Sequence, residues 1–275
     1  MAIIYHISDL HVKDSIFAWL HNRRVDSLIS KVIHDYDVSH AGEDAVVLLT
    51  GDLVDSGGKR EYRKLEKYLD RLDAKMKVRF VPGNHDIGGG GGTLFSRESV
   101  EEFEKLAARY GFNAGYISKY NSEYPGYTPF HEIFAGKNGD DPVRVLYLNS
   151  CCEDQMGDFA RGNLGMYQLN ALEKALINQA GIQTVICIHH KPLEQATPRF
   201  IMDLEREDRK ALRYFIKKYG VAAMLYGHKD PRKEDPASFP PFEDNCAVLN
   251  ANRSVKDCFF HKLLCTAEGI TVKKI

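Results

Sequence analysis

The chain has 275 residues, of which 44% are apolar, so it can bury a sizeable core. Its 37 Lys and Arg residues balance 38 Asp and Glu residues, and the formal net charge is -1. This balance argues against bulk attraction to nucleic acid or an anionic membrane and leaves room only for a small local basic patch. No apolar run reaches the roughly 18 residues of a membrane span, and site-like residues begin at Asp9, which leaves no room for a signal peptide. We therefore expect a cytoplasmic protein without a membrane span or a basic nucleic-acid-binding face.

Short aliphatic runs alternate with amphipathic stretches along the chain, and this alternation predicts an α/β fold in which helices cover β-sheets. The predicted strands cover residues 3–8, 45–50, 78–81, 143–149, 184–189, 221–226, 247–249, 259–264 and 270–272. The predicted helices cover residues 24–34, 61–72, 100–110, 166–179 and 205–219. We find no internal repeat, charge block or linker, so we expect one domain over residues 1–275 and leave its oligomeric state open.

Two segments differ from this pattern. Residues 111–141 are rich in Tyr, Gly, Asn and Pro, which suggests a lid or hairpin insertion. Its aromatic side chains would either stabilise short paired strands or stack on a base. The five glycines Gly88 to Gly92 are not followed by Gly-Lys-Ser/Thr, so we expect a flexible loop instead of a phosphate-binding loop.

Clusters of His, Asp and Asn follow five of the predicted strands directly. The carboxyl ends of strands in β-α-β units meet at one sheet edge, where ligands bind, so these clusters should lie close together. They are Asp9-Leu10-His11, Gly51-Asp52-Leu53-Val54-Asp55, Gly83-Asn84-His85-Asp86, His189-His190-Lys191-Pro192 and Gly227-His228-Lys229-Asp230.

The donor atoms in these clusters suit divalent transition metals. Asp9 and His11 are two residues apart and can reach one ion, and the two carboxylate oxygens of Asp52 can bridge two ions. Asn84 offers an amide oxygen, and the histidines offer imidazole nitrogens. This set without sulfur suits Mn, Fe, Zn or Co. Two such ions can hold a bridging hydroxide and stabilise the attacking and leaving oxygens of phosphate ester hydrolysis.

The order of these motifs resembles the calcineurin-like metallophosphoesterase superfamily, and in particular its small members similar to cyclic nucleotide phosphodiesterases. The resemblance spans positions 9 to 230. It implies a four-layer sandwich, in which two mixed β-sheets face each other and helices flank them. The dinuclear site would lie at the sheet edge.

The resemblance also implies a role for each site residue. One ion would bind Asp9, His11, Asp52 and the last motif position, Asp230. The other ion would bind Asp52, Asn84, His189 and His228. His85 would contact the phosphoryl or leaving oxygen, and Asp86 would orient His85.

Three positions leave alternatives open. We choose His189 over His190 as a ligand because it directly follows an apolar strand, which leaves His190 to face the substrate. Asp55 would hold its loop or orient a ligand histidine. Asp230 replaces the family's last histidine, so it either binds the first ion as a carboxylate or turns away and weakens that site.

We therefore expect a metal-dependent hydrolase, most simply a phosphodiesterase that acts on a small nucleotide-like or other diester. A carboxylate at position 230 lowers the positive charge of the site, which favours a monoanionic diester over a dianionic monoester. The alternatives are a phosphomonoesterase or protein phosphatase, and a metal-depleted binding protein without activity.

Overall fold

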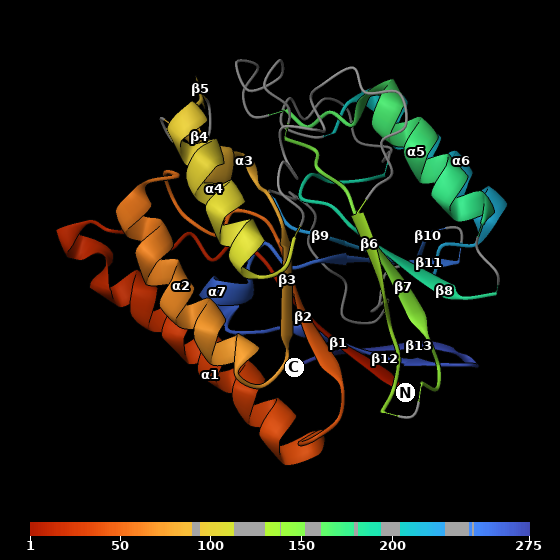
Figure 1. Ribbon diagram of the computed structural model, residues 1–275, viewed down its shortest axis with the longest axis horizontal. Coiled ribbons are helices and arrows are strands. Elements are labelled where there is room, and N and C mark those ends of the chain that lie inside the picture. The colour runs from red at the N-terminus through yellow and green to blue at the C-terminus, as the bar shows by residue number, and fades with distance from the viewer. Residues whose placement is uncertain are drawn as a thin grey trace.

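The computed structural model of the protein (Figure 1) describes most of the chain. The described residues are 1–89, 94–112, 130–137, 139–151, 161–178, 181–193, 204–228, 242–243 and 245–275. Among them, no helix combines the length and the apolar character needed to cross a membrane.

The first sheet has five strands in the order β13-β12-β1-β2-β3. Strand β1 pairs in parallel with β2 and antiparallel with β12, so the sheet is mixed. The bounds are β1 Ala2–Ile7, β2 Ala45–Thr50, β3 Lys77–Val81, β12 His261–Thr266 and β13 Gly269–Lys274.

The second sheet has six strands in the order β10-β11-β9-β8-β7-β6. Its four central strands run parallel, and the two edge strands pair antiparallel to their neighbours. The bounds are β6 Phe130–Phe134, β7 Val143–Tyr147, β8 Gln183–Cys187, β9 Ala223–Tyr226, β10 Phe242–Glu243 and β11 Cys246–Asn250.

The helices complete a sandwich of four layers (Figure 1). Helices α1, α2 and α4 pack on the outer face of the first sheet, and α5 and α6 cover the second sheet. The longer helices are α1 Trp19–Ser39, α2 Lys59–Asp73, α4 Arg97–Arg109, α5 Gly165–Ile177 and α6 Arg206–Tyr219. The shorter elements are the 3-10 turn η1 Ile16–Ala18, α3 Asn84–Ile87, α7 Ser254–Asp257 and the strand pair β4 Gly88–Gly89 and β5 Leu94–Phe95.

Strand β7 and its extension show how the sequence produces these layers. Val145 and Tyr147 point into the core between the two sheets, whereas Leu146 and Leu148 pack in the core beneath α5 and α6. All four side chains are fully buried because both faces of the sheet are covered. The buried part of the strand and its extension, residues 145–148, therefore appears in the sequence as a short apolar run.

The predicted fold class is confirmed: nine predicted strands and five predicted helices are present, with shifted ends. Helix α1 extends five residues beyond the predicted segment 24–34 at each end. The expectation of a loop for all of Gly88 to Gly92 was wrong, because Gly88 and Gly89 pair with Phe95 and Leu94; the other three glycines lie outside the described residues. In the segment 111–141, residues 130–134 form β6, while residues 113–129 and 138 lie outside the described part.

A buried histidine pair joins β1 and β12. The Nδ1 atoms of His6 and His261 lie 3.2 Å apart, and His6 Nε2 lies 2.9 Å from Thr50 Oγ1. Burial, reinforced by His261, lowers the pKa of His6 well below 6.5. Burial, reinforced by Lys274, lowers the pKa of His261 to about 3.

We expect this pair to make the protein sensitive to acid. The unfolded chain takes up protons on both imidazoles below about pH 6.5, but the folded chain does not, so the free energy of unfolding falls as the pH falls. The variant His261→Gln lacks one of these two proton-binding imidazoles. The loss of stability between about pH 7.5 and 5.5 should be about 1.4 kcal/mol smaller than in the wild type, as measured by urea unfolding with a chelator present. Equal losses in the two proteins would contradict this account.

Candidate functional site

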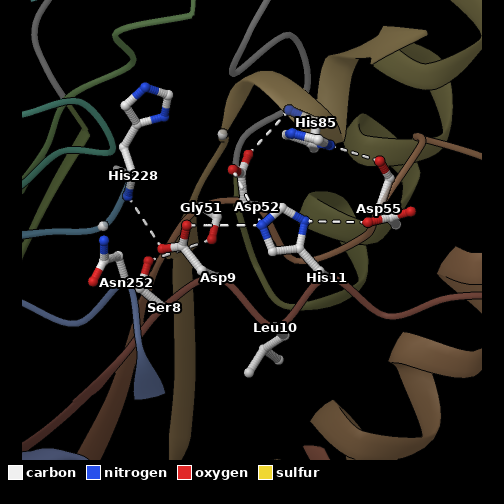
Figure 2. Close-up of polar contacts among 12 residues, drawn as sticks. Ser8, Asp9, Leu10, His11, Gly51, Asp52, Asp55, His85, His228 and Asn252 are labelled. Carbon is white, nitrogen blue, oxygen red and sulfur yellow. Dashed lines mark hydrogen bonds and ion pairs between the residues drawn. The ribbon is translucent and has the colours of Figure 1, made fainter. Parts of the chain in front are cut away.

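The predicted site residues within the described part of the chain meet at the carboxyl ends of the parallel strands, on loops from both sheets. Figure 2 shows Asp9, His11, Asp52, His85 and His228 among them. The loops after β1 and β2 are fastened by backbone hydrogen bonds. Asp9 N donates to Gly51 O at 3.0 Å, and His11 N donates to Asp52 O at 2.9 Å. This pairing fixes the spacing between the Asp-x-His and Gly-Asp motifs.

Four site residues have left-handed backbone conformations, which are uncommon for side chains other than glycine. The φ angles are 53° at Asp9, 43° at His11, 51° at Asp52 and 55° at His228. Such conformations cost about 1–3 kcal/mol each and persist only where the surroundings impose them. All four residues are predicted metal ligands, and they lie where the chain leaves a strand and turns at the sheet edge.

The carboxylate of Asp52 lies at the centre of the cluster and is 3% exposed. Its Oδ1 accepts a hydrogen bond of 3.0 Å from the His85 amide. Its Oδ2 lies 3.6 Å from His11 Nε2 and 3.4 Å from His189 Nε2. Asp52 thus joins imidazoles supplied by the two sheets.

The orientation of His189 follows from its outer hydrogen bond. Its Nδ1 lies 2.7 Å from Thr50 O, and because a carbonyl only accepts, Nδ1 carries the proton. Nε2 therefore points into the site, 3.2 Å from Asn84 Oδ1 and 3.1 Å from His228 Nδ1. Hydrogen bonds of this kind fix the tautomer of metal-binding histidines.

The charges of these buried groups favour a cation at the site. Burial and the charge of Asp52 raise the pKa of Asp9 to about 6. Burial opposes ionisation of Asp52, but His189 and His11 hold the pKa of Asp52 well below its usual range. Burial alone would lower the pKa of His189, yet the Asp52 carboxylate raises it to about 9. Closely spaced carboxylates thus attract positive charge, which a proton or a metal ion can supply.

His11 is oriented by an acidic neighbour. Its Nδ1 lies 3.5 Å from Asp55 Oδ1, and Lys13 Nζ lies 3.0 Å from the same oxygen. The adjacent His11 imidazole, helped by Lys13, keeps the pKa of Asp55 below its usual range. This contact places Asp55 beside a predicted ligand histidine, which was one of the two positions considered for it.

His85 and Asp86 have separate partners. His85 Nδ1 lies 2.6 Å from Asp55 O, which leaves Nε2 as the ring nitrogen that can face a substrate. The Asp86 carboxylate accepts from the backbone amides of Leu53, Val54 and Gly83 at 2.8–3.0 Å. Asp86 therefore fastens the loop after β3 to the loop after β2. These partners are backbone amides, and the expectation that Asp86 orients His85 stays a prediction.

His190 is fully buried beside His189 and not at the surface. Its Nδ1 lies 2.7 Å from Ser150 Oγ, and its ring centroid lies 4.5 Å from that of His228. The backbone of Gly162 covers the ring, so that a Cβ at residue 162 would lie 2.5 Å from it.

The contacts of Ser150 with His190 and of Thr50 with His189 were not predicted, because a single hydroxyl or carbonyl at a strand end carries no recognisable signal in the sequence.

The donor atoms fit metal ions in two groups that share Asp52. One comprises His11, Asp52 and His85, and the other comprises Asp52, His189 and His228. Within each group the candidate ligand atoms lie within 4.8 Å of one another. Asp9 adjoins the first group, with Oδ1 3.8 Å from His11 Nε2, whereas Asp230 lies outside the described residues.

Comparison with known proteins gives a family and several distant relatives. The sequence model of the calcineurin-like phosphoesterase family matches residues 3–230. The chain is 23% identical over 228 residues to a cAMP/cGMP dual specificity phosphodiesterase of Mycobacterium tuberculosis, covering 82% of this chain and 61% of that protein. It is 24% identical over 230 residues to a probable glycerophosphodiester phosphodiesterase of Arcobacter nitrofigilis, covering 82% and 71%. The chain thus spans less than two thirds of the first of these relatives.

A solved structure of the sulfate thiohydrolase SoxB from Thermus thermophilus superposes with a TM-score of 0.55 at 14% identity, covering 99% of this chain and 56% of that one. The NAD nucleotidase of Haemophilus influenzae gives a TM-score of 0.51 at 12% identity, covering 99% and 49%. At these identities the likeness shows a shared fold.

The close approach of Gly227 to the Asp-x-His loop yields a prediction. A Cβ at this position would lie 2.0 Å from Ser8 Oγ and 2.4 Å from Asp9 Oδ2, so Gly227→Ala should displace both side chains. We expect a loss of about 1–3 kcal/mol in the free energy of unfolding, measured on metal-free protein. Gly58→Ala serves as the control, because its Cβ would meet only ordinary contacts at 3.7 Å and 3.9 Å. Similar losses in both variants would show that the Gly227 contact is not specific.

Proposed function

Because the chain belongs to the calcineurin-like phosphoesterase family of metal-dependent phosphoester hydrolases, we propose that it is a phosphodiesterase with two divalent transition-metal ions. Its substrate would be a small phosphate ester of the nucleotide-like or other diester class. Two relatives with phosphodiesterase names support this substrate class.

The observation that carries the proposal is the shared Asp52 carboxylate. Its Oδ2 lies 3.6 Å from His11 Nε2 and 3.4 Å from His189 Nε2, so the carboxylate stands between imidazoles that belong to two groups of candidate ligands. A carboxylate in this position can bridge two cations, whereas a site for a single ion would not need ligands on both sides. Mn, Fe, Zn and Co all suit this mixture of oxygen and nitrogen donors.

We assign the ligands in two sets that share Asp52. The first ion would be held by Asp9, His11, Asp52 and Asp230, and the second by Asp52, Asn84, His189 and His228. When bound, such ions supply a water nucleophile near neutral pH and offset the charge of the phosphoryl group. Asp55 and the Thr50 carbonyl hold the outer nitrogens of His11 and His189, so the Nε2 atom of each ring would be the one available to an ion.

His85 is the group best placed to handle the leaving oxygen. Its Nδ1 donates to the Asp55 carbonyl, so a proton on Nε2 makes the ring an imidazolium that can donate to that oxygen. Asp86 acts indirectly, because it holds the backbone that carries Asn84 and His85. We therefore treat His85 as the catalytic acid and Asp86 as a positioning residue.

The two-ion proposal predicts the effect of removing the central carboxylate charge. Asp52→Asn should lower hydrolysis of bis(p-nitrophenyl) phosphate by at least about 10³-fold and reduce the bound metal from two ions per chain, measured by elemental analysis. The surface variant Asp37→Asn, which loses a charge paired with Lys75, should retain both properties. Full activity in Asp52→Asn, or full activity of the wild type after verified metal removal, would refute the proposal.

The role of His85 predicts a dependence on the leaving group. His85→Ala should lower the turnover of diesters with alkoxide leaving groups by about 10²- to 10⁴-fold, because these need protonation. The loss should be much smaller for nitrophenolate, which departs without a proton, and the metal content should not change. The control is His34→Ala, on the exposed side of α1. Equal losses for both kinds of leaving group would indicate that His85 only positions the phosphate.

A further inference from the structure

An exposed apolar cluster, which we name the apolar tip, lies at the start of α1. It consists of Ile16, Phe17, Trp19 and Leu20, whose exposed fractions are 91%, 89%, 64% and 49%. Four large apolar side chains within five residues are an unusual concentration on a protein surface, and such patches commonly mark a binding site.

The apolar tip is held in place by its own loop. Lys13 N donates to Asn22 Oδ1 at 3.1 Å, and Asn22 Nδ2 donates back to Lys13 O at 2.8 Å. The next side chain, His21, lies with Nε2 2.8 Å from Leu10 O. Ala18 at the middle of the tip is buried. The exposed side chains therefore project from a loop that is closed at its base.

Basic residues lie on the segments next to the apolar tip, in the loop before it, in the following turn of α1 and in the first turns of α2. We name this set the basic rim; it comprises Lys13, Arg23, Arg24, Lys59, Arg60, Arg63 and Lys64. The first turns of α2 adjoin the loop, because Lys64 Nζ lies 2.5 Å from Asp14 Oδ1 and 3.3 Å from Lys13 O. Figure 1 shows the amino-terminal ends of α1 and α2 on the same side of the molecule.

The charge of this region differs from that of the whole chain. Residues 10–24 and 55–64 contain these seven basic residues and only three acidic ones, Asp14, Asp55 and Glu61. The region therefore has an excess of four positive charges in a chain whose net charge is -1. An apolar projection next to an excess of positive charge matches the surface of an anionic membrane, whose headgroups are negative and whose interior is apolar.

From this arrangement we propose that the apolar tip and the basic rim dock the protein on an anionic lipid bilayer. Phe17 and Trp19 would enter the interfacial region, where aromatic rings are favoured, and the rim would meet the headgroups. A second copy of the chain fits less well, because a symmetric dimer through the tip would bring two basic rims together. The proposal concerns surface binding and does not depend on the hydrolytic activity.

Trp19 provides a direct test, because it is the sole tryptophan of the chain. The metal-loaded protein is mixed with vesicles of phosphatidylcholine and phosphatidylglycerol, or of phosphatidylcholine alone. With the anionic vesicles we expect a blue shift of the tryptophan emission and quenching by lipids brominated on their acyl chains. Both signals should weaken as salt is added, since salt screens the rim.

Two variants separate the apolar and electrostatic contributions while keeping Trp19 as the reporter. Ile16→Ser/Phe17→Ser should weaken partitioning to anionic vesicles by about tenfold or more, because it removes two insertable side chains. Arg23→Glu/Arg24→Glu should weaken it through charge. The matched control, Met166→Ser/Ile177→Ser, removes exposed apolar side chains of α5 and should bind like the wild type. All variants should hydrolyse a soluble diester at the wild-type rate.

Three outcomes would overturn the proposal. The first is an unchanged Trp19 emission with anionic vesicles. The second is a blue shift that follows protein concentration without lipid, together with a dimer in sedimentation, which would assign the tip to a second copy. The third is an equal shift with soluble polyglutamate, which would assign the surface to an acidic polypeptide.

Discussion

A carboxylate removed from water requires hydrogen-bond donors or positive charge, and the buried Asp52 carboxylate imposes this requirement on the whole sheet edge. The requirement is met by the His85 amide from the loop after β3, by His11 from the loop after β1 and by His189 from the loop after β8. These donors belong to both sheets. The packing of the two sheets against each other therefore brings together the groups that stabilise the buried Asp52 carboxylate.

The same convergence leaves little room for side chains at the points where the loops cross. A Cβ on Gly83 would lie 2.2 Å from Asp52 N, and a Cβ on Gly51 would lie 2.5 Å from His189 Nδ1. Glycine at these two positions allows the loops to approach, and at Gly51 it also accommodates a φ of 88°. The left-handed backbone conformations of the site residues persist because the large apolar core fixes the strands that carry them.

The sequence was sufficient to predict the sandwich and most of the site, because both depend on features with a clear pattern. Apolar runs identify the central strands, and Asp9, Asp52 and Asn84 stand directly after them. The described predicted ligands accordingly lie in one cluster, although their roles as ligands remain a proposal.

Other features could not be predicted because they depend on contacts between distant segments. The Asp86 carboxylate bonds to backbone amides of another loop, and an amide is present at almost every residue, so no pattern identified its partners. The start of α1 was missed because Trp19 and Leu20 face outward and interrupt the apolar periodicity. Strand β6 lies in the segment 111–141 that was expected to form a hairpin or lid, but its bounds and its pairing with β7 were not predicted, because its partner β7 lies beyond that segment.

The closed base of the loop between Lys13 and Asn22 has a consequence for how this protein could diversify or be redesigned. The two hydrogen bonds at the base hold Lys13 and Asn22 together, so the residues between them project from a fixed pair of anchor points. Insertions or replacements at residues 16–20 can then alter what the surface recognises while the contact of His21 with the Leu10 carbonyl beside His11 is kept. The loop therefore behaves as an exchangeable module, through which one hydrolytic scaffold can be directed to different locations.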